Sequence, residues 1–232
     1  MASWVDYWNS DHPIYVNDRH KALHAAGIAR DFARHIPARD AAVLDYGCGE
    51  ALYAEDVARL CGRLVLADAA PAVRERLAER VAALPSVAVA SPEEVLAMPD
   101  GSFDLIVANS LLQYLTIGQL VELLPLWRRL LKPEGRLVLA DVVPPDVSPV
   151  TDAKALLSFA WKGGFVGAAL MGFVRTALSD YRKLRGELGF TTHEEAEMLA
   201  LLSRHGFAAE RSHPNFGHNQ ARMTFVAKAG EA

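Results

Sequence analysis

The chain has 232 residues, enough for one large α/β domain or for one domain with a modest insertion. Hydrophobic residues make up 51% and charged residues 22%, a balance that can fill a buried core. The net charge of −4 leaves no cationic excess to neutralise phosphates, so nucleic acid is not expected as a partner. The two cysteines cannot form a disulfide framework and lack metal-site spacing, which favours a reducing, cytoplasmic location.

Residues 1–37 are predicted to form an N-terminal helical cap. Asn17 can cap a helix that runs to about His35, because apolar residues recur there at helical spacing, and Pro37 then ends it. The chain opens with no basic segment followed by an apolar one, so no secretory signal is expected.

Residues 38–145 alternate short apolar runs with helical patterns. The expected strands are 41–44, 64–67, 87–90, 103–108 and 136–141. The expected helices are 50–61, one beginning at Pro71, 92–97, and 116–131, the last with a capping box of Thr116 and Gln119. A turn at 132–135 precedes the fifth strand. Such alternation favours a mostly parallel sheet with helices on both faces.

The pattern changes after residue 145, although a single domain is still expected. Residues 146–190 contain no strand signal and predict a helical insertion, two helices hinged near Gly163-Gly164. Their apolar tract, Gly163 to Val174, is far shorter than the roughly 20 residues that span a bilayer. Residues 191–232 should complete the sheet, with a helix restarting at a capping box of Thr192 and Glu195 and then a β-hairpin.

Two glycines directly follow the first predicted strand. Gly47 and Gly49 remove side chains where a main chain must approach a ligand, and the next helix would offer free N–H groups. Asp68 ends the second strand about 20 residues later, where an acid can accept hydrogen bonds from ribose hydroxyls. The third glycine of a dinucleotide fingerprint would fall on Leu52. These features predict an adenosine-containing cofactor and argue against a dinucleotide.

Four segments together resemble the motifs of class I S-adenosylmethionine (SAM)-dependent methyltransferases, and are most similar to the small-molecule branch called type 11. They are Val43–Gly49, Leu66–Pro71, Pro99–Ser110 and Arg129–Val138. The resemblance covers roughly residues 40–142. It implies a Rossmann-like, doubly wound sheet of about seven mostly parallel strands with the last one antiparallel, and SAM as the cofactor.

The resemblance also assigns cofactor contacts by position. Gly47 and Gly49 would face the methionine part, with Asp45 organising the turn, while Asp68 would hold the ribose diol. Ala69 would line the adenine slot, with Ala70 as the alternative.

Three other positions bear on the same site. Asn109, at the end of the fourth strand, would border both cofactor and substrate. Ala51 stands where the family carries a third glycine, and Ser91 where it often carries an acid near the adenine amine. Ser91 is expected to contact adenine, with Glu93 as the alternative.

A methyltransferase needs a general base only when the attacking atom starts protonated and weak. Candidates lie in the N-terminal segment, after the fourth strand, and in the loop between the last two strands. They are His12, Tyr15, His20, His24, Tyr114, His213 and His218. We single out His218 and Tyr15, with Tyr114 as a third catalytic candidate. His20 and His24 are spaced for metal binding, but without a further ligand nearby no metal site is expected.

The sequence therefore predicts a methyltransferase that acts on a small, partly apolar molecule by in-line displacement, with the insertion as a lid. Ser110 follows Asn109 where enzymes that methylate nucleic-acid bases carry a proline-rich run, so a DNA base is not expected. The insertion could instead form a homodimer contact, or a peripheral membrane contact through residues 155–174, as in a membrane-surface lipid methyltransferase. Two further functions are compatible with the sequence, that of a NAD-type oxidoreductase and that of a non-catalytic SAM-binding module.

Overall fold

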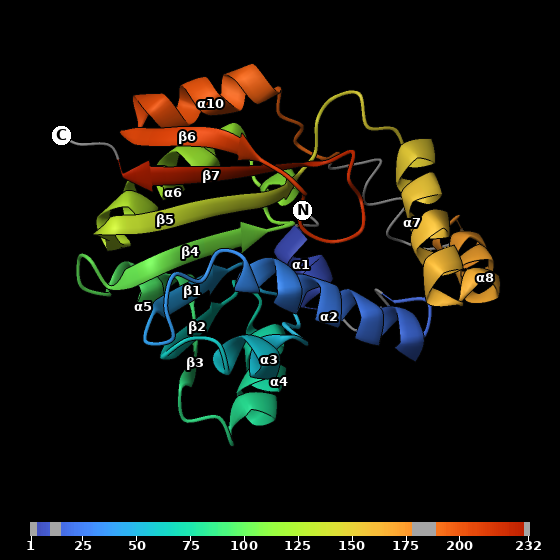
Figure 1. Ribbon diagram of the computed structural model, residues 1–232, viewed down its shortest axis with the longest axis horizontal. Coiled ribbons are helices and arrows are strands. Elements are labelled where there is room, and N and C mark those ends of the chain that lie inside the picture. The colour runs from blue at the N-terminus through green and yellow to red at the C-terminus, as the bar shows by residue number, and fades with distance from the viewer. Residues whose placement is uncertain (1–3, 10–14, 178–188, 230–232) are drawn as a thin grey trace.

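A computed structural model describes residues 4–9, 15–177 and 189–229 (Figure 1). Its centre is a seven-stranded sheet with strand order β3-β2-β1-β4-β5-β7-β6. The strands are β1 (Ala42–Tyr46), β2 (Arg63–Ala67), β3 (Val87–Ala90), β4 (Phe103–Asn109), β5 (Leu131–Val142), β6 (Phe207–Ser212) and β7 (Met223–Ala229). Strands β1 to β5 pair in parallel, whereas β7 runs antiparallel to both β5 and β6. The predicted fold is confirmed.

Helices cover both faces of the sheet, so the central strands are buried on both sides. Helices α2 (Asp18–Ala33), α3 (Ala54–Ala58) and α4 (Pro71–Val81) pack on one face. Helices α5 (Pro92–Leu96), α6 (Ile117–Leu130) and α10 (Glu195–Arg204) pack on the other. In β4, Leu105 and Val107 join the first layer, while Ile106 and Ala108 join the second. Side chains that alternate between two apolar layers explain why this strand reads as a continuous apolar run.

Local capping signals fix several helix starts. Asn17 Oδ1 accepts a hydrogen bond from the His20 N–H at the start of α2, at 2.8 Å. The capping box of Thr116 and Gln119 forms at α6 as predicted, and Pro71 is the first residue of α4. These contacts satisfy N–H groups that the first turn of a helix leaves without partners.

Three predicted boundaries were wrong. Helix α3 begins at Ala54 rather than at residue 50, because the preceding residues form a turn in which Ala51 has φ +37°. Strand β5 begins at Leu131, since the expected turn at 132–135 is an irregularity within the strand, between the pairs Phe103–Leu131 and Leu105–Arg136.

The third correction concerns α10. Its N-cap is Glu194, which makes no side-chain capping bond, so the predicted capping box at Thr192 does not form. The preceding segment is instead held extended, because the Thr191 N–H donates to the Gln113 carbonyl at 3.0 Å and the His193 N–H donates to the Val143 carbonyl at 2.9 Å. Main-chain bonds to distant residues therefore set this boundary.

The described part of the insertion up to residue 177 forms two helices, α7 (Pro149–Gly163) and α8 (Val166–Ala177), beyond the end of the sheet to which β4 points (Figure 1). Gly164 ends α7 at φ +72°, a left-handed conformation that glycine adopts without steric cost. The pair packs against α2, where Arg19 Nε donates to the Gly163 carbonyl. Within the described ranges, the structure contains no helix that is long and apolar enough to span a membrane.

The two-layer packing predicts that Leu→Ala substitutions at two positions will differ greatly in their effect on stability. Leu124 on α6 is fully buried, whereas Leu96 on α5 is 61% exposed. We expect Leu124→Ala to lower the free energy of unfolding by about 2–5 kcal/mol, because it leaves a cavity in the core. Leu96→Ala should change it by less than about 0.5 kcal/mol. Urea denaturation of both variants measures the difference, and similar values would contradict this account of the core.

Candidate active site

The glycine turn lies across the ends of two neighbouring parallel strands. The N–H groups of Gly47 and Cys48 both donate to the Ala67 carbonyl at the end of β2, at 2.8 and 3.0 Å. Gly47 has φ +77° and Gly49 has φ +55°, conformations that residues with a Cβ rarely adopt. A Cβ on Gly47 would also come within 2.7 Å of the Leu111 side chain. The turn therefore requires glycine at position 47 for both conformation and space.

Ala51 completes this turn in a left-handed conformation, with φ +37°. The residue expected to replace a family glycine thus keeps a backbone shape that favours glycine. Arg80 on α4 holds the turn from outside, since its guanidinium donates to the carbonyls of Glu50 and Ala51.

Asp68 faces the turn directly. Its carboxylate accepts hydrogen bonds from the N–H groups of Gly49 and Ala70, both at 2.9 Å. Burial raises the pKa of Asp68, and these main-chain hydrogen bonds partly offset the rise. A carboxylate has about four acceptor positions, so two remain for a ligand.

Asp45 lies beneath the same turn, on the central strand β1. Tyr53 OH donates to its Oδ2 at 2.7 Å, while its Oδ1 is buried without a hydrogen-bond partner. Burial raises the pKa of Asp45 to about 7, against the opposing effect of the Tyr53 hydrogen bond. This carboxyl group therefore changes charge near neutral pH.

Three buried acceptor atoms without partners gather around the turn. They are Asp45 Oδ1, Glu50 Oε2 and Asn109 Oδ1. An unsatisfied buried acceptor costs about 1–3 kcal/mol, so three in one region favour a ligand that brings hydrogen-bond donors or positive charge.

A cluster of imidazole and aromatic rings lies between α2, the lid and the β6–β7 loop. The ring centroids of His20, His24 and His218 are 6.2 to 6.4 Å apart, and Tyr15 lies 5.4 Å from His20 and 5.6 Å from His24. From the lid, Phe159 stacks on His218 at 4.9 Å. Two catalytic candidates, Tyr15 and His218, therefore belong to one cluster.

Burial controls the charge of this cluster. It lowers the pKa values of His20 and His24 to about 4 and also lowers that of His218, so all three imidazoles are neutral at pH 7. Burial and the nearby charge of Glu50 raise the pKa of Tyr15 to about 12. Glu50 follows Gly49 directly, so the charge that acts on Tyr15 belongs to the glycine turn.

The other catalytic candidates lie apart from this cluster or are not described. Tyr114, in a short 3-10 helix (Leu112–Tyr114), packs against Trp4 at 4.7 Å and Trp8 at 5.6 Å, both from α1 (Trp4–Trp8). His213 is exposed. His12 lies outside the described residues. The described residues contain no group of three His, Cys, Asp or Glu side chains arranged to hold a metal ion.

An open groove of about 760 Å³ runs between α2, α7 and the β6–β7 loop. His24, His218 and Phe159 of the ring cluster are among its lining residues. Among the large apolar side chains of the insertion, Phe159 and Phe165 pack inward, whereas Trp161 and Met171 are exposed. The Phe173 side chain lies outside the described residues. The groove thus opens from solvent onto the ring cluster.

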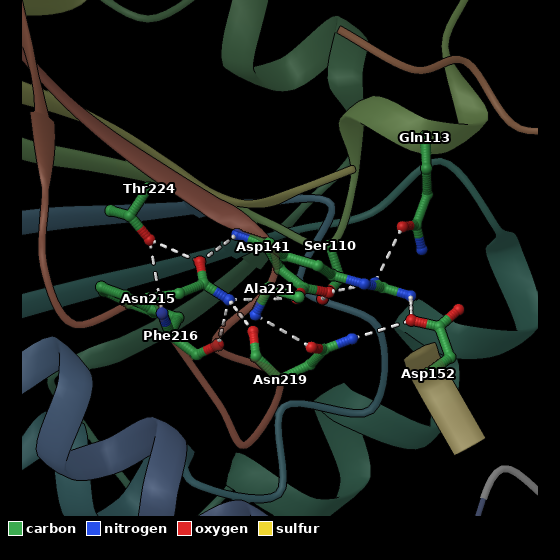
Figure 2. Close-up of polar contacts among 10 residues, drawn as sticks. Ser110, Gln113, Asp141, Asp152, Asn215, Phe216, Asn219, Ala221 and Thr224 are labelled. Atoms are coloured by element: carbon green, nitrogen blue, oxygen red, sulfur yellow. Dashed lines mark hydrogen bonds and ion pairs between the residues drawn. The ribbon is translucent and has the colours of Figure 1, made fainter. Parts of the chain in front are cut away.

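Arg222, before β7, joins the lid to the sheet. Its Nη1 donates to Asp141 Oδ2 at 2.7 Å, at the end of β5, and its Nη2 donates to Asp152 Oδ1 on α7 at 3.1 Å. Ser110, next to Asn109, donates to the same Asp141 oxygen at 2.7 Å (Figure 2). These side chains are largely buried, so breaking one partner would leave an uncompensated charge. The network fixes α7 relative to the ends of β4 and β5.

Two asparagines extend the network into the β6–β7 loop (Figure 2). Asn219 Nδ2 donates to Asp152 Oδ1 at 2.7 Å. Asn215 accepts a hydrogen bond from Thr224 Oγ1 at 2.7 Å and donates to the Asn219 carbonyl at 2.9 Å. The loop that carries His218 is therefore held by buried hydrogen bonds on both sides of that residue.

Comparison with known proteins identifies the domain. Residues 44–139 match the type 11 family model, described as a methyltransferase domain. This match places residues 44–139 with the class I SAM-dependent methyltransferase domains. The match supports SAM as the cofactor of this domain. A search of the curated proteins finds no significant match. The comparisons give no support to an oxidoreductase, a membrane-surface lipid methyltransferase or a non-catalytic module.

Solved structures share the fold of this chain at low sequence identity. The N-methyltransferase NodS from Bradyrhizobium japonicum, in complex with S-adenosylhomocysteine (SAH), is 18% identical with a TM-score of 0.59, over 98% of this chain and 97% of NodS. The DhpI–SAH complex is 14% identical with a TM-score of 0.61, over 98% and 96% of the two chains. The mitomycin 7-O-methyltransferase MmcR is 19% identical with a TM-score of 0.62, over 90% of this chain and 55% of MmcR.

The residues around the glycine turn fit SAM, which carries an ammonium group and a sulfonium. The unsatisfied oxygens of Asp45, Glu50 and Asn109 suit such a cation, and Asp68 retains acceptor positions for ribose hydroxyls. Ala69 is exposed beside Asp68. Ser91 caps α5, since its Oγ accepts from the Glu94 N–H at 3.3 Å. Its adenine contact and the other assigned cofactor contacts stay predictions.

Sequence reasoning missed the Arg222 network. None of Arg222, Asp141 and Asp152 belongs to a recognisable motif, and they lie on three separate elements. One signal was present for Asp141, an acid at the end of a predicted parallel strand, where ligand-binding residues gather.

Asp68→Ala should weaken SAH binding by about 1.5–3 kcal/mol, because it removes charged acceptors from the site. Isothermal titration calorimetry measures this loss. Asp100→Ala is the matched control, since the Asp100 side chain is 78% exposed and pairs with Arg129 away from the turn. Equal affinities of the Asp68 variant and the wild type would contradict the assignment.

The raised pKa of Asp45 predicts that both the stability of the protein and its affinity for SAH depend on pH. The folded-state pKa of about 7 lies above the ordinary value of 3.8, so protonation stabilises the fold at low pH and this contribution is lost as the pH rises towards 7. Between about pH 5 and pH 7.5, wild-type stability should fall relative to Asp45→Asn by on the order of 2–3 kcal/mol. SAH affinity should rise over the same range in the wild type only, because ionised Asp45 attracts the cation. Denaturant titrations and calorimetry check both, and parallel curves for the two proteins would argue against this role.

Proposed function

We propose that this protein catalyses methyl transfer from SAM to a small, partly apolar acceptor that enters through the groove between α2 and α7. The observation that carries the proposal is a row of neighbouring side chains that leads from the groove towards the glycine turn. His24 and His218 line the groove, Tyr15 contacts His24, and the charge of Glu50 acts on Tyr15. A volume of about 760 Å³ is in the range of small-molecule sites.

SAM, when bound, supplies the activated methyl group. The protein's own contribution is to align the acceptor, and positioning alone can account for several kcal/mol of barrier reduction, up to about 7–11. Aromatic rings from the lid and α2 would orient an apolar acceptor, and Phe159 stacked on His218 already presents one such surface.

His218 is the residue we propose as general base. Its lowered pKa keeps the imidazole neutral at pH 7, so a ring nitrogen can take a proton from an acceptor hydroxyl or amine. Tyr15 would act differently, because its raised pKa keeps the phenol protonated and therefore a hydrogen-bond donor. Tyr114 remains a third catalytic candidate, and it packs against Trp4 and Trp8 of α1.

The lid would exclude water from the reaction. Helices α7 and α8 pack on α2 through Phe165 and Ala160, and the Arg222 network ties α7 to the sheet. A site closed in this way strengthens electrostatic interactions inside it. The N-terminal segment would complete the cover, since Asn9 accepts a hydrogen bond from the Ala72 N–H at 2.8 Å, close to Asp68.

Incubation of cell extracts with methyl-labelled SAM and the purified protein tests the proposed function. A labelled product of low molecular mass, identified by mass spectrometry, is the expected result. Tight SAH binding with no labelled product from any fraction would instead support a non-catalytic SAM-binding module.

Once the acceptor is identified, its methylation by the His218→Gln variant can be measured. We expect kcat to fall by about 10²–10⁴-fold, the usual contribution of a general base, and SAH affinity to stay unchanged. Wild-type activity should fall only below the ordinary histidine pKa of about 6.5, because burial lowers the pKa of His218. The variant should lose this dependence. His213→Gln, an exposed histidine in the same loop, is the control. An unchanged kcat in His218→Gln would remove it as the base.

A further inference from the structure

Cationic side chains line the outer part of the groove. Lys154, Ser158 and Lys162 are spaced by four residues along α7 and so share one helical face, and all three line the groove. Across from them, Gly27, Arg30 and Arg34 line it from α2. Two helices therefore present positive charge to the same opening.

These charges are concentrated in a protein of opposite overall sign. The lining includes four cationic side chains, Arg30, Arg34, Lys154 and Lys162, and a single carboxylate, Asp31. The whole chain, by contrast, has a net charge of −4. Like charges that face one another across a groove repel, so this arrangement costs stability unless an anion binds there.

The single carboxylate does not neutralise the other cations. Asp31 Oδ1 pairs with Arg34 at 2.5 Å, and its Oδ2 accepts a hydrogen bond from the Gly217 N–H at 2.6 Å. Among the residues that the structure describes, Arg30, Lys154 and Lys162 have no ion-pair or hydrogen-bond partner. Three cations can therefore bind a ligand.

The inner part of the groove has a different character. His24 and His218 are neutral there because burial lowers the pKa of each, and Phe159 lies stacked against His218. The groove therefore changes from cationic at its opening to aromatic and uncharged where it reaches the ring cluster. A ligand that matched both parts would have an anionic end and an apolar body.

We propose that the groove selects acceptors that carry a carboxylate or phosphate group, held by Arg30, Lys154 and Lys162, with an apolar body extending to Phe159 and His218. This inference rests on the proposed function, because it takes the groove as the acceptor site. It adds the chemical class of the acceptor, which the fold and the family leave open.

Gly27 provides a way to block the groove without disturbing the fold. It lies within α2 and lines the groove, and a Cβ added there would meet no atom within 4 Å. Replacing a glycine inside a helix also removes a conformational cost. Gly27→Phe should therefore fold normally and place a ring in the groove.

Matched naphthalene probes test the proposal by calorimetry with the SAH-bound protein. The probes are 2-naphthoate, 2-naphthyl phosphate and the uncharged 2-naphthamide. We expect at least one anionic probe to bind about tenfold more tightly than the amide, since hydrogen bonds to charged groups are worth about this much. The two anionic probes distinguish a carboxylate from a phosphate acceptor.

Three variants locate the site at which the probes bind. Lys154→Gln/Lys162→Gln should bring the anion-to-amide affinity ratio close to one, whereas Arg204→Gln/Lys228→Gln, which removes two exposed cations outside the groove, should leave it unchanged. Gly27→Phe should abolish binding of all three probes. Equal affinities of the wild type for all probes, a ratio that survives the lysine substitutions, or probe binding by Gly27→Phe would each overturn the inference.

Failure of this inference is distinguishable from failure of the proposed function. SAH affinity, measured on the same samples, should be unaffected by the lysine and Gly27 substitutions. A labelled product without any anionic group would overturn the inference and leave the methyltransferase function standing. Binding of an anionic probe in the groove without formation of any labelled product would instead contradict the proposed function.

Discussion

The site depends on hydrogen bonds between the ends of two adjacent parallel strands. Tyr46 and Ala67 are paired at the carboxyl ends of β1 and β2, so the chain that leaves β1 must turn directly over β2. The turn takes its hydrogen bonds from the Ala67 carbonyl and the Asp68 carboxylate. That arrangement requires left-handed backbone at Gly47 and Gly49, and it places an acid against the main chain of the turn. The cofactor contacts predicted for Gly47, Gly49 and Asp68 all depend on this one constraint.

The fold buries several oxygen atoms at the site without hydrogen-bond donors, and this lowers the stability of the protein when no ligand is bound. Asp45 Oδ1, Glu50 Oε2 and Asn109 Oδ1 stand on three different loops or strands, yet they converge around one turn. A ligand with positive charge and hydrogen-bond donors relieves that cost, and anything that binds only the folded state also stabilises it. The same groups that weaken the protein alone would therefore favour binding of the proposed cofactor.

On the acceptor side of the site, burial decides which side chains are charged. Three histidines are close together and stay neutral because burial makes a charged imidazole unfavourable. The cations of the groove remain at its opening, where solvent reaches them. Between these regions the Arg222 network holds the lid and the β6–β7 loop in fixed positions. Charge is thus separated along the groove according to depth, and the selectivity that we propose for the groove depends on this separation.

The sequence by itself determined the strands, the two-layer sheet, the Thr116 capping box and the glycine turn with Asp68, because each depends on residues close together in the chain or on a spacing common to the family. It misplaced the starts of α3 and β5 and the cap of α10. Ala51 closes a left-handed turn before α3, and Thr191 before α10 is held by a main-chain hydrogen bond to the distant Gln113. Only the tertiary structure brought Tyr15 and His24 to His218, and Asp152 to Arg222. These residues lie on elements far apart in sequence, and no local pattern specifies which loops will meet at the end of a sheet.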